Sequence, residues 1–254
     1  MNAIQKTFGK SKVFIPVIHC IDWDQVNQQA ALAQDAGADG IMLINQGGMS
    51  IPKILASCLE ESKGVAEVAP NLHIGVNFLG HNIQKVMSAC AHVMSLDGLQ
   101  KVNLIWQDNA GFMPHNARDN LLAAERIREA RAESYWKGIV FGGVAFKYQE
   151  PVALEDVGYV AYLAALAGVD VVTTSGPGTG EPPGVEKIAR MKDAIGQHAL
   201  AIASGMTCDN VKQFLPHADA FLVATGIESS FGHFDVELMK RMADTIHSYV
   251  VPAS

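Results

Sequence analysis

Residues 169–195 read VDVVTTSGPGTGEPPGVEKIARMKDAI, and they contain a strand, a loop and a helix in that order. The run Val169–Ser175 is short and rich in valine, without the polar–apolar alternation of a half-exposed strand, which favours a strand buried on both faces. Glycine and proline then mark a loop up to Gly184. Pro182 and Pro183 stand where a helix begins, since proline is tolerated in a first turn, and residues 184–196 have helical periodicity.

The same strand–helix pattern recurs along the whole chain. Amphipathic segments at 24–38, 82–96 and 120–136 alternate with short apolar runs, and AGADG and AGVD place a glycine where two helices end. The residues Thr207–Asn210 predict the N-cap of a seventh helix. The other seven predicted strands are Val13–Ile21, Gly40–Asn45, His73–Leu79, Lys101–Trp106, Gly138–Phe146, Ala199–Gly205 and Ala220–Gly226.

Eight strand–helix units that fill the chain predict an α/β fold, a single (β/α)8 TIM barrel over residues 1–254. A doubly wound open sheet is the alternative, but the first unit has no dinucleotide-binding fingerprint. The segment Gln107–Arg118 is long for a loop between a strand and a helix, so it is a candidate lid. Its apolar residues Phe112 and Met113 are expected to be exposed, in the lid or in an interface between identical chains, since we expect a homo-oligomer.

Composition excludes several classes of protein. The net charge of −7 and the lack of a basic cluster argue against nucleic-acid binding. No apolar run is long enough to span a bilayer and the polar start MNAIQKTFGKSK is no signal peptide, so we expect a cytoplasmic protein without membrane association. Cysteines at 20, 58, 90 and 208 form no CxxC pair and are expected to be buried thiols.

In TIM barrels the active site lies at the C-terminal ends of the strands. Asparagine is frequent at these predicted ends, and its side chain both donates and accepts hydrogen bonds, which suits hydroxyl or carbonyl groups of a ligand. Capping of the next turn by the same side chains is the alternative. The predicted substrate-binding residues are His19, Asn45, Asn77, Asn103, Ser175 and Thr179.

Three residues are predicted to be catalytic. Lys147 would bind an anion, act as a base or form a Schiff base if burial lowers its pKa, and a plain surface lysine is the alternative. Glu181 follows a stiff glycine–proline loop, where it is either a general acid or base or a carboxylate favoured by a helix N-terminus. Asp22 is the third acid–base candidate, and with a substrate phosphate it would form a Mg²⁺ site. Otherwise no metal site is predicted, because the histidines form no HxH, HExxH or i,i+4 pair.

The loops after the seventh and eighth predicted strands resemble the phosphate sites of such barrels. ASGMT (203–207) and ATGIESS (224–230) each place glycine beside a hydroxyl residue at a strand end, where its lack of a Cβ lets the backbone approach a ligand. We therefore predict phosphate binding by Ser204, Gly205, Thr225 and Gly226, with two tight turns as the alternative. The loop 173–184 is neither a Walker A loop nor a GxGxxG loop. No cofactor is predicted, although a flavin-binding barrel would share these glycines.

The segments VDVVTTSGPGTGEPPGVEKIARMKDAI and ALAIASGMTCDNVKQFLPHADAFLVATGIES, with HIGVNFLGHN and KVNLIW before them, resemble the BtpA family of barrel proteins, also called SgcQ-like. The resemblance covers roughly Leu72 to Phe234 and is strongest after Val169. It implies a phosphate-binding type of barrel, in a family named from photosystem I assembly and from nucleosidase-like proteins.

Two departures from the family pattern stand out. The fifth strand of the family carries a DVxxKHA-like segment, whereas this chain reads GGVAFKYQE, with Lys147 retained but Gly143 in place of the acid and Tyr148 in place of the histidine. The loop after the first strand, IHCIDWDQ, also lacks the usual proline and glycine. These changes indicate a divergent member with altered chemistry.

The expected function is that of an enzyme acting on a small phosphorylated or ribosyl-containing metabolite at the barrel mouth. Isomerisation, aldol-type cleavage and N-glycosidic cleavage all remain open. The alternative is a non-catalytic ligand sensor or assembly factor built on the same barrel.

Overall fold

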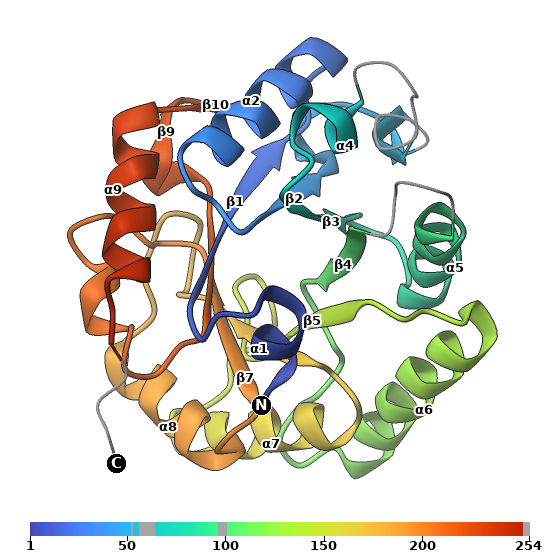
Figure 1. Ribbon diagram of the computed structural model, residues 1–254. Helices are drawn as coiled ribbons and strands as arrows, with labels where there is room; N and C mark the ends of the chain where they lie inside the picture. The colour runs from blue at the N-terminus through green and yellow to red at the C-terminus, as the bar shows by residue number, and fades with distance from the viewer. Residues whose placement is uncertain (52, 56–63, 96–100, 251–254) are drawn as a thin grey trace.

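A computed structural model describes residues 1–51, 53–55, 64–95 and 101–250, and it shows eight parallel strands closed into a barrel (Figure 1). Strand β1 pairs with β2 on one side and with β8 on the other, so the sheet has no free edge. All eight predicted strands are confirmed. Their bounds are β1 Val13–His19, β2 Gly40–Ile44, β3 His73–Asn77, β4 Val102–Gln107, β5 Ile139–Gly143, β6 Val171–Thr174, β7 Ala199–Ala203 and β8 Ala220–Val223.

Helices surround the barrel (Figure 1). Several begin at a side chain that accepts a backbone N–H, as at Asp22 and Asp235, and Gly37 and Gly168 follow two helix ends with positive φ. The helices are α2 Trp23–Asp35, α4 Val65–Val68, α5 Ile83–Met94, α6 Ala117–Ser134, α7 Val157–Leu166, α8 Val185–Ile195 and α9 Val236–His247. Helix α7 has no charged residue and leaves Tyr159, Tyr162 and Leu166 exposed.

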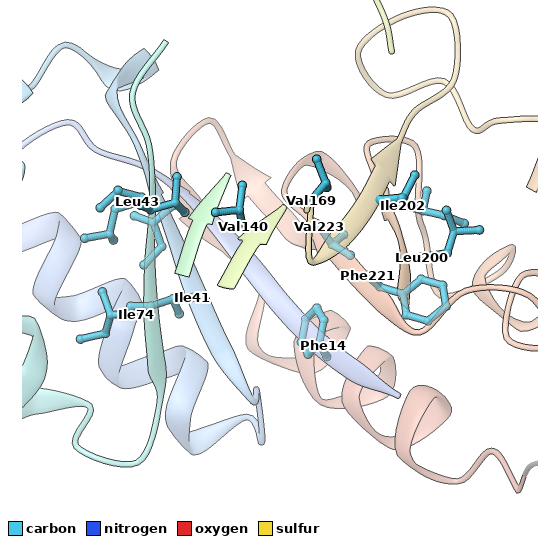
Figure 2. Packing of buried hydrophobic residues seen from close by; sticks show 14 of the residues in the cluster. Phe14, Ile41, Leu43, Ile74, Val140, Val169, Leu200, Ile202, Phe221 and Val223 are labelled. Atoms are coloured by element: carbon cyan, nitrogen blue, oxygen red, sulfur yellow. The ribbon is translucent and has the colours of Figure 1, made fainter. Parts of the chain in front are cut away.

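The strands bury both faces, and each face belongs to a different apolar cluster. On β7 the residues Leu200 and Ile202 face the helices, while the alanines between them face the barrel interior. Figure 2 shows part of the outer layer, which includes Phe14, Ile41 and Phe221. Both layers are apolar, which explains why the strands read as continuous apolar runs in the sequence.

Side chains of very different size fill the barrel interior. Large rings enter from one side, Trp106 from β4 and Phe141 from β5, while β7 contributes only alanines and β8 contributes Ala220 and Leu222 to the same cluster. A short helix, α1 (Ala3–Phe8), inserts Ile4 into this cluster from the N-terminal end of the barrel, in the centre of the ring in Figure 1. The interior is therefore a packed core that is closed at the bottom and leaves the C-terminal end for a site.

The structure corrects several expectations. No α-helix follows β7, where Thr207–Asn210 precedes only a short 3₁₀ turn, η2 (Val211–Gln213). A hairpin of β9 (Glu228–Ser230) and β10 (His233–Phe234) replaces the plain loop expected after β8, and α1 was not expected at all. Phe112 is only 3% exposed, so it is not the exposed residue predicted for a lid.

Other expectations concern thiols and membranes. Cys20 and Cys90 are buried as predicted, Cys208 is half-buried, and Cys58 lies outside the described residues. Within the described part of the chain, no helix has the length and apolar character to cross a bilayer.

Candidate functional site

Three consecutive loops at the barrel mouth pack backbone against backbone, and glycine makes each contact. A Cβ added at Gly205, after β7, would overlap the backbone of Glu181 and Pro182 in the loop after β6. A Cβ at Gly226, after β8, would overlap the carbonyl oxygen of Met206. These two glycines are thus required by close approach of protein backbone, rather than by a ligand alone.

The stacked loops form one wall of a small pocket at the mouth, with an enclosed volume of about 60 Å³. On this measure one water molecule needs about 10–15 Å³, so the pocket has room for a group of a few non-hydrogen atoms. Side chains or backbone from β1, β2, β4 and the loops after β5 to β8 meet here. The lining residues that matter chemically are His19, Gln46, Trp106, Lys147, Thr179, Ser204, Gly205, Thr225 and Gly226.

Lys147 is the cation of this pocket. Its Nζ donates to Thr179 Oγ1 at 3.2 Å and lies about 6 Å from the ring centroids of Phe146 and Tyr148. The Tyr148 hydroxyl is 3.0 Å from the same Thr179 oxygen. Thr179, predicted to bind substrate, therefore orients the lysine in this structure.

The loop that carries Lys147 is strained and is held by buried donors. Ala145 and Tyr148 have positive φ, which is unfavourable for residues with a Cβ. Lys187 of α8 donates to the carbonyl oxygens of Ala145 and Ser175 at 2.6 and 2.7 Å, and burial lowers the pKa of this lysine to about 8. Ser175 Oγ also accepts the Lys147 backbone N–H at 2.8 Å. Ser175 is fully buried, and in this structure it supports the loop.

The two predicted phosphate loops both line the pocket. Among the described residues, no hydrogen bond occupies the backbone N–H groups of Gly205, Thr225 or Gly226. The Ser204 hydroxyl is 3.2 Å from the Gly180 N–H, which it accepts, and 3.4 Å from the Gly178 carbonyl oxygen, to which it donates. The loops therefore offer unpaired backbone donors next to Lys147.

His19, at the end of β1, also lines the pocket and pairs with Glu228 of β9. Nδ1 of His19 is 3.0 Å from Glu228 Oε1, and both side chains are almost fully buried. The ring of Phe231, from the β9–β10 hairpin, stacks on the imidazole with 4.6 Å between centroids and 20° between planes.

A second acid lies at the end of β4. Asp108 Oδ1 accepts a hydrogen bond from Asn77 Nδ2 at 2.8 Å, and burial raises the pKa of this carboxyl although Asn77 and Lys147 oppose the shift. A Cβ at Gly143 would overlap the Asp108 backbone, so an acid at position 143, as in the BtpA pattern, has no room here. Trp106 Nε1, next in the wall, is buried without a hydrogen-bond partner among the described residues.

The remaining predicted residues lie elsewhere. Asn45 accepts the Leu79 N–H at 2.9 Å and so ties two loops together. Asp22 caps α2 through the Gln25 N–H, and Glu181 is exposed with its carboxyl group folded over Gly178. Neither acid lines the mouth pocket, so neither carboxyl group is placed to exchange a proton with a ligand bound there.

The expectation that Asn103 lies at the mouth is wrong. Asn103 is the second residue of β4, because the strand starts at Val102 and runs one residue further than predicted. Its Oδ1 is 3.0 Å from Nδ1 of His73, the first residue of β3, at the bottom of the barrel.

Sequence reasoning missed Glu228, Asp108 and Lys187. Glu228 was part of the quoted ATGIESS loop, but its partner His19 is 209 residues away. Asp108 directly follows β4, and an accurate strand end would have marked it. Lys187 lies on α8 at a position where the sequence suggests only a solvated helix face.

A larger pocket of about 330 Å³ lies beside the mouth, between the loops after β5 and β6. Lys147 lines both pockets, and Tyr148, Ser175 and Lys187 line the larger one. Its volume is within the range of small-molecule sites. Within the described ranges, no cluster of three or more His, Cys, Asp or Glu side chains is arranged to hold a metal ion.

Comparison with known proteins supports the fold. No family model matches the chain, so the BtpA resemblance stays a prediction. An uncharacterized protein of Thermococcus kodakarensis is 27% identical over 217 residues, which cover 82% of this chain and 79% of that protein.

Solved TIM barrels match most of the chain at low identity. Phosphoribosyl anthranilate isomerase from Thermus thermophilus has a TM-score of 0.58 at 16% identity and covers 92% of this chain and 98% of its own. (S)-3-O-geranylgeranylglyceryl phosphate synthase from Thermoplasma acidophilum, solved with its substrate sn-glycerol-1-phosphate, has a TM-score of 0.64 at 14% identity, with 98% and 100% coverage. These likenesses establish the barrel fold.

Proposed function

We propose that this protein is an enzyme that binds the phosphate group of a small metabolite in the mouth pocket. The observation that carries the proposal is the convergence of Lys147 with the loops Ser204–Gly205 and Thr225–Gly226 in one pocket. The ammonium group would supply charge and the backbone N–H groups of these loops would supply donors, which is the combination that phosphate oxygens accept. The proposed site uses no cofactor.

The sizes of the two pockets indicate how such a ligand would lie. The mouth pocket, about 60 Å³ and lined by both Lys147 and His19, has room for a phosphate group and the few atoms next to it. The pocket of about 330 Å³ shares Lys147 with it and has room for the remainder of the ligand. The same barrel fold occurs in enzymes whose names specify phosphorylated compounds, which supports this class of ligand.

A ligand sensor without catalysis would need the phosphate loops but no acid–base groups. His19, paired with Glu228, lines the pocket, and Asp108, a carboxyl group of raised pKa, lines an adjacent pocket that shares Trp106 with it. Titratable groups in such settings are typical of catalytic sites. This observation favours an enzyme in the class of phosphosugar or ribosyl-metabolite isomerases, lyases or nucleosidases. We also propose a cytoplasmic location and a homo-oligomer. The exposed side chains of Tyr159, Tyr162 and Leu166 on α7 form a surface through which identical chains would associate.

Thermal unfolding in the presence of paired ligands tests the proposal. Each phosphorylated compound is compared with its dephosphorylated form, beginning with ribose 5-phosphate against ribose. A ligand present at a hundred times its dissociation constant stabilises by about 2.7 kcal/mol, which raises the midpoint by roughly 5–10 °C for a chain of this length.

The variant Lys147→Met is expected to abolish the ligand-dependent shift while changing the unliganded midpoint little. Lys240→Met is the matched control, since this lysine is exposed on α9 and should keep the full shift. If no phosphorylated compound raises the midpoint more than its dephosphorylated partner, the proposal is wrong and the paired glycines serve only the loop packing.

A further inference from the structure

The strongest unassigned feature of the mouth is the pair formed by His19 and Glu228. A carboxylate carries no proton to donate, so at the 3.0 Å contact the imidazole Nδ1 carries the hydrogen and Glu228 Oε1 accepts it. That hydrogen bond fixes the tautomer and leaves the lone pair of Nε2 available. Within the described part of the chain, Nε2 has no hydrogen-bond partner, and His19 lines the pocket that also contains Lys147.

Glu228 is held rigidly in place. The Gly232 N–H donates to the same Oε1 at 3.0 Å, and the Gly232 carbonyl oxygen accepts from Gln25 Nε2 at 2.5 Å. Gly232 has a φ of 76°, and a Cβ at this position would come within 2.7 Å of Ile21 Cδ1. The tip of the β9–β10 hairpin is thus fixed to the barrel, with its carboxylate against the imidazole.

Phe231 completes the arrangement. Its ring covers one face of the His19 imidazole at 4.6 Å, yet 54% of the residue is exposed. Phe231 therefore limits access of water to the imidazole from outside while the pocket side stays open. A histidine that is oriented by a carboxylate, shielded on one face and in the same pocket as a lysine has the arrangement of a general base near an oxyanion-stabilising cation.

We propose that His19 is a general base that removes a proton from the carbon next to the carbonyl of a phosphorylated hydroxyaldehyde or hydroxyketone. This inference rests on the proposed function, because the phosphate in the mouth pocket places that carbon. The C–H bond breaks, the proton passes to His19 Nε2, and the electron pair becomes an enediolate whose negative oxygen lies beside the Lys147 ammonium. The hydroxyl hydrogen of the enediolate then passes to its negative oxygen while the imidazolium returns the proton to the neighbouring carbon, which completes an isomerisation; alternatively, the imidazolium exchanges the proton with solvent.

Solvent exchange provides the direct test. Ribose 5-phosphate and ribulose 5-phosphate are incubated with the protein in D₂O, and loss of the proton next to the carbonyl is followed by ¹H NMR. The wild type is expected to exchange this proton. His19→Asn is expected to lower the rate by about 10²–10⁴-fold, the usual contribution of a positioned base.

The variant Glu228→Gln distinguishes a catalytic role of the His19–Glu228 pair from a purely structural one. Glutamine fills the same space, but its amide N–H₂ can donate to Nδ1, which favours the tautomer with the proton on Nε2. Exchange is expected to fall by about 10²-fold or more with an unchanged KM, while the thermal midpoint and the shift caused by ribose 5-phosphate stay close to wild type. A structural link alone would lower the midpoint and leave the exchange rate per folded molecule unchanged.

Two outcomes would overturn the inference, and they differ from failure of the proposed function. If phosphorylated ligands stabilise the wild type but no proton exchanges, His19 is not a base of this kind. The same follows if His19→Asn exchanges at the wild-type rate. If no phosphorylated ligand stabilises the wild type, the proposed function itself fails and the base assignment fails with it.

Discussion

Each end of the barrel has a histidine packed against a phenylalanine, and the two are chemically opposite. At the bottom, His73 meets Phe8 edge-on, with 4.6 Å between centroids and 62° between planes, and its polar partner is the neutral Asn103. At the top, His19 meets Phe231 at the same centroid distance but stacked at 20°, and its partner is the carboxylate of Glu228.

The difference lies in what surrounds each ring. Burial lowers the pKa of His73 although the hydrogen bond to Asn103 and the charge of Asp39 oppose the shift, and α1 covers the region. His19 lines a pocket that Lys147 also lines. The bottom of this barrel therefore contributes stability. The top carries polar and charged groups that the stability of the core does not require.

The largest loss of stability is expected for a substitution at the bottom of the barrel. Ile4→Ala removes a fully buried side chain from the interior cluster and should lower the free energy of unfolding by about 2–5 kcal/mol, measured by urea denaturation. The ligand-dependent shift of the remaining folded protein should be unchanged. Met1→Ala, at an 85% exposed residue, is the control for changes at the N-terminus. A lost shift with full stability in Ile4→Ala would mean that the two ends are not separate.

A smaller loss of stability is expected for a substitution at the top of the barrel. Gly205→Ala places a Cβ into the backbone of the neighbouring loop at a φ of 74°, and should cost about 2 kcal/mol or more and abolish the ligand-dependent shift. Gly180→Ala is matched in φ, at 79°, but has nothing within 4 Å of the added Cβ. It should cost only about 1 kcal/mol and keep the shift. Equal effects of both variants in denaturation and ligand binding would contradict the stacked-loop account.

A substitution of Asp108 tests whether this buried carboxyl group at the top of the barrel lowers the free energy of unfolding. Its folded-state pKa lies above the usual 3.8 because of burial, so ionisation is disfavoured in the folded protein at neutral pH. Asp108→Asn keeps the acceptor for Asn77 and should raise the free energy of unfolding at pH 7 by about 1 kcal/mol or less. That gain should shrink as the pH falls through the raised pKa and vanish below 3.8, where both forms are neutral. A gain that does not depend on pH would rule out this origin.

The smallest effect is expected at His73. Its folded-state pKa is below the usual 6.5, so the unfolded chain binds more protons below pH 6.5 and stability falls as the pH falls. His73→Gln should remove a few tenths of a kcal/mol of this acid dependence, because solvent screens the partly exposed ring. Denaturation series between pH 7 and pH 5 measure it. An acid dependence identical to that of the wild type would show that His73 does not titrate differently on folding.

The barrel could be predicted from the sequence because its signal is local: each strand is a continuous apolar run, and each helix has its own period and end signals. The site, in contrast, depends on contacts between residues that are far apart in the sequence. Asn103 was assigned to the mouth although it is the third residue of the predicted run Lys101–Trp106, and in the structure it lies near the start of β4. His19 and Glu228 meet across 209 residues, which no local pattern reveals.

The glycines show a second limit of the sequence. Gly205 and Gly226 were expected to let backbone approach a ligand, and in the structure they let backbone approach backbone. Both needs select glycine, so the sequence could not distinguish them. Lys147 and the two loops nevertheless converge in one pocket, as their places at successive strand ends predicted.

The most direct test of the account is calorimetric titration of the phosphorylated compound that gives the largest thermal shift, with its dephosphorylated form as the reference. The account predicts equal Kd values for the wild type and Ile4→Ala, and a loss of binding of at least tenfold, about 1.4 kcal/mol, for Lys147→Met. Binding of the same strength in Lys147→Met, or no preference of the wild type for the phosphorylated form, would contradict a phosphate site at the top of this barrel.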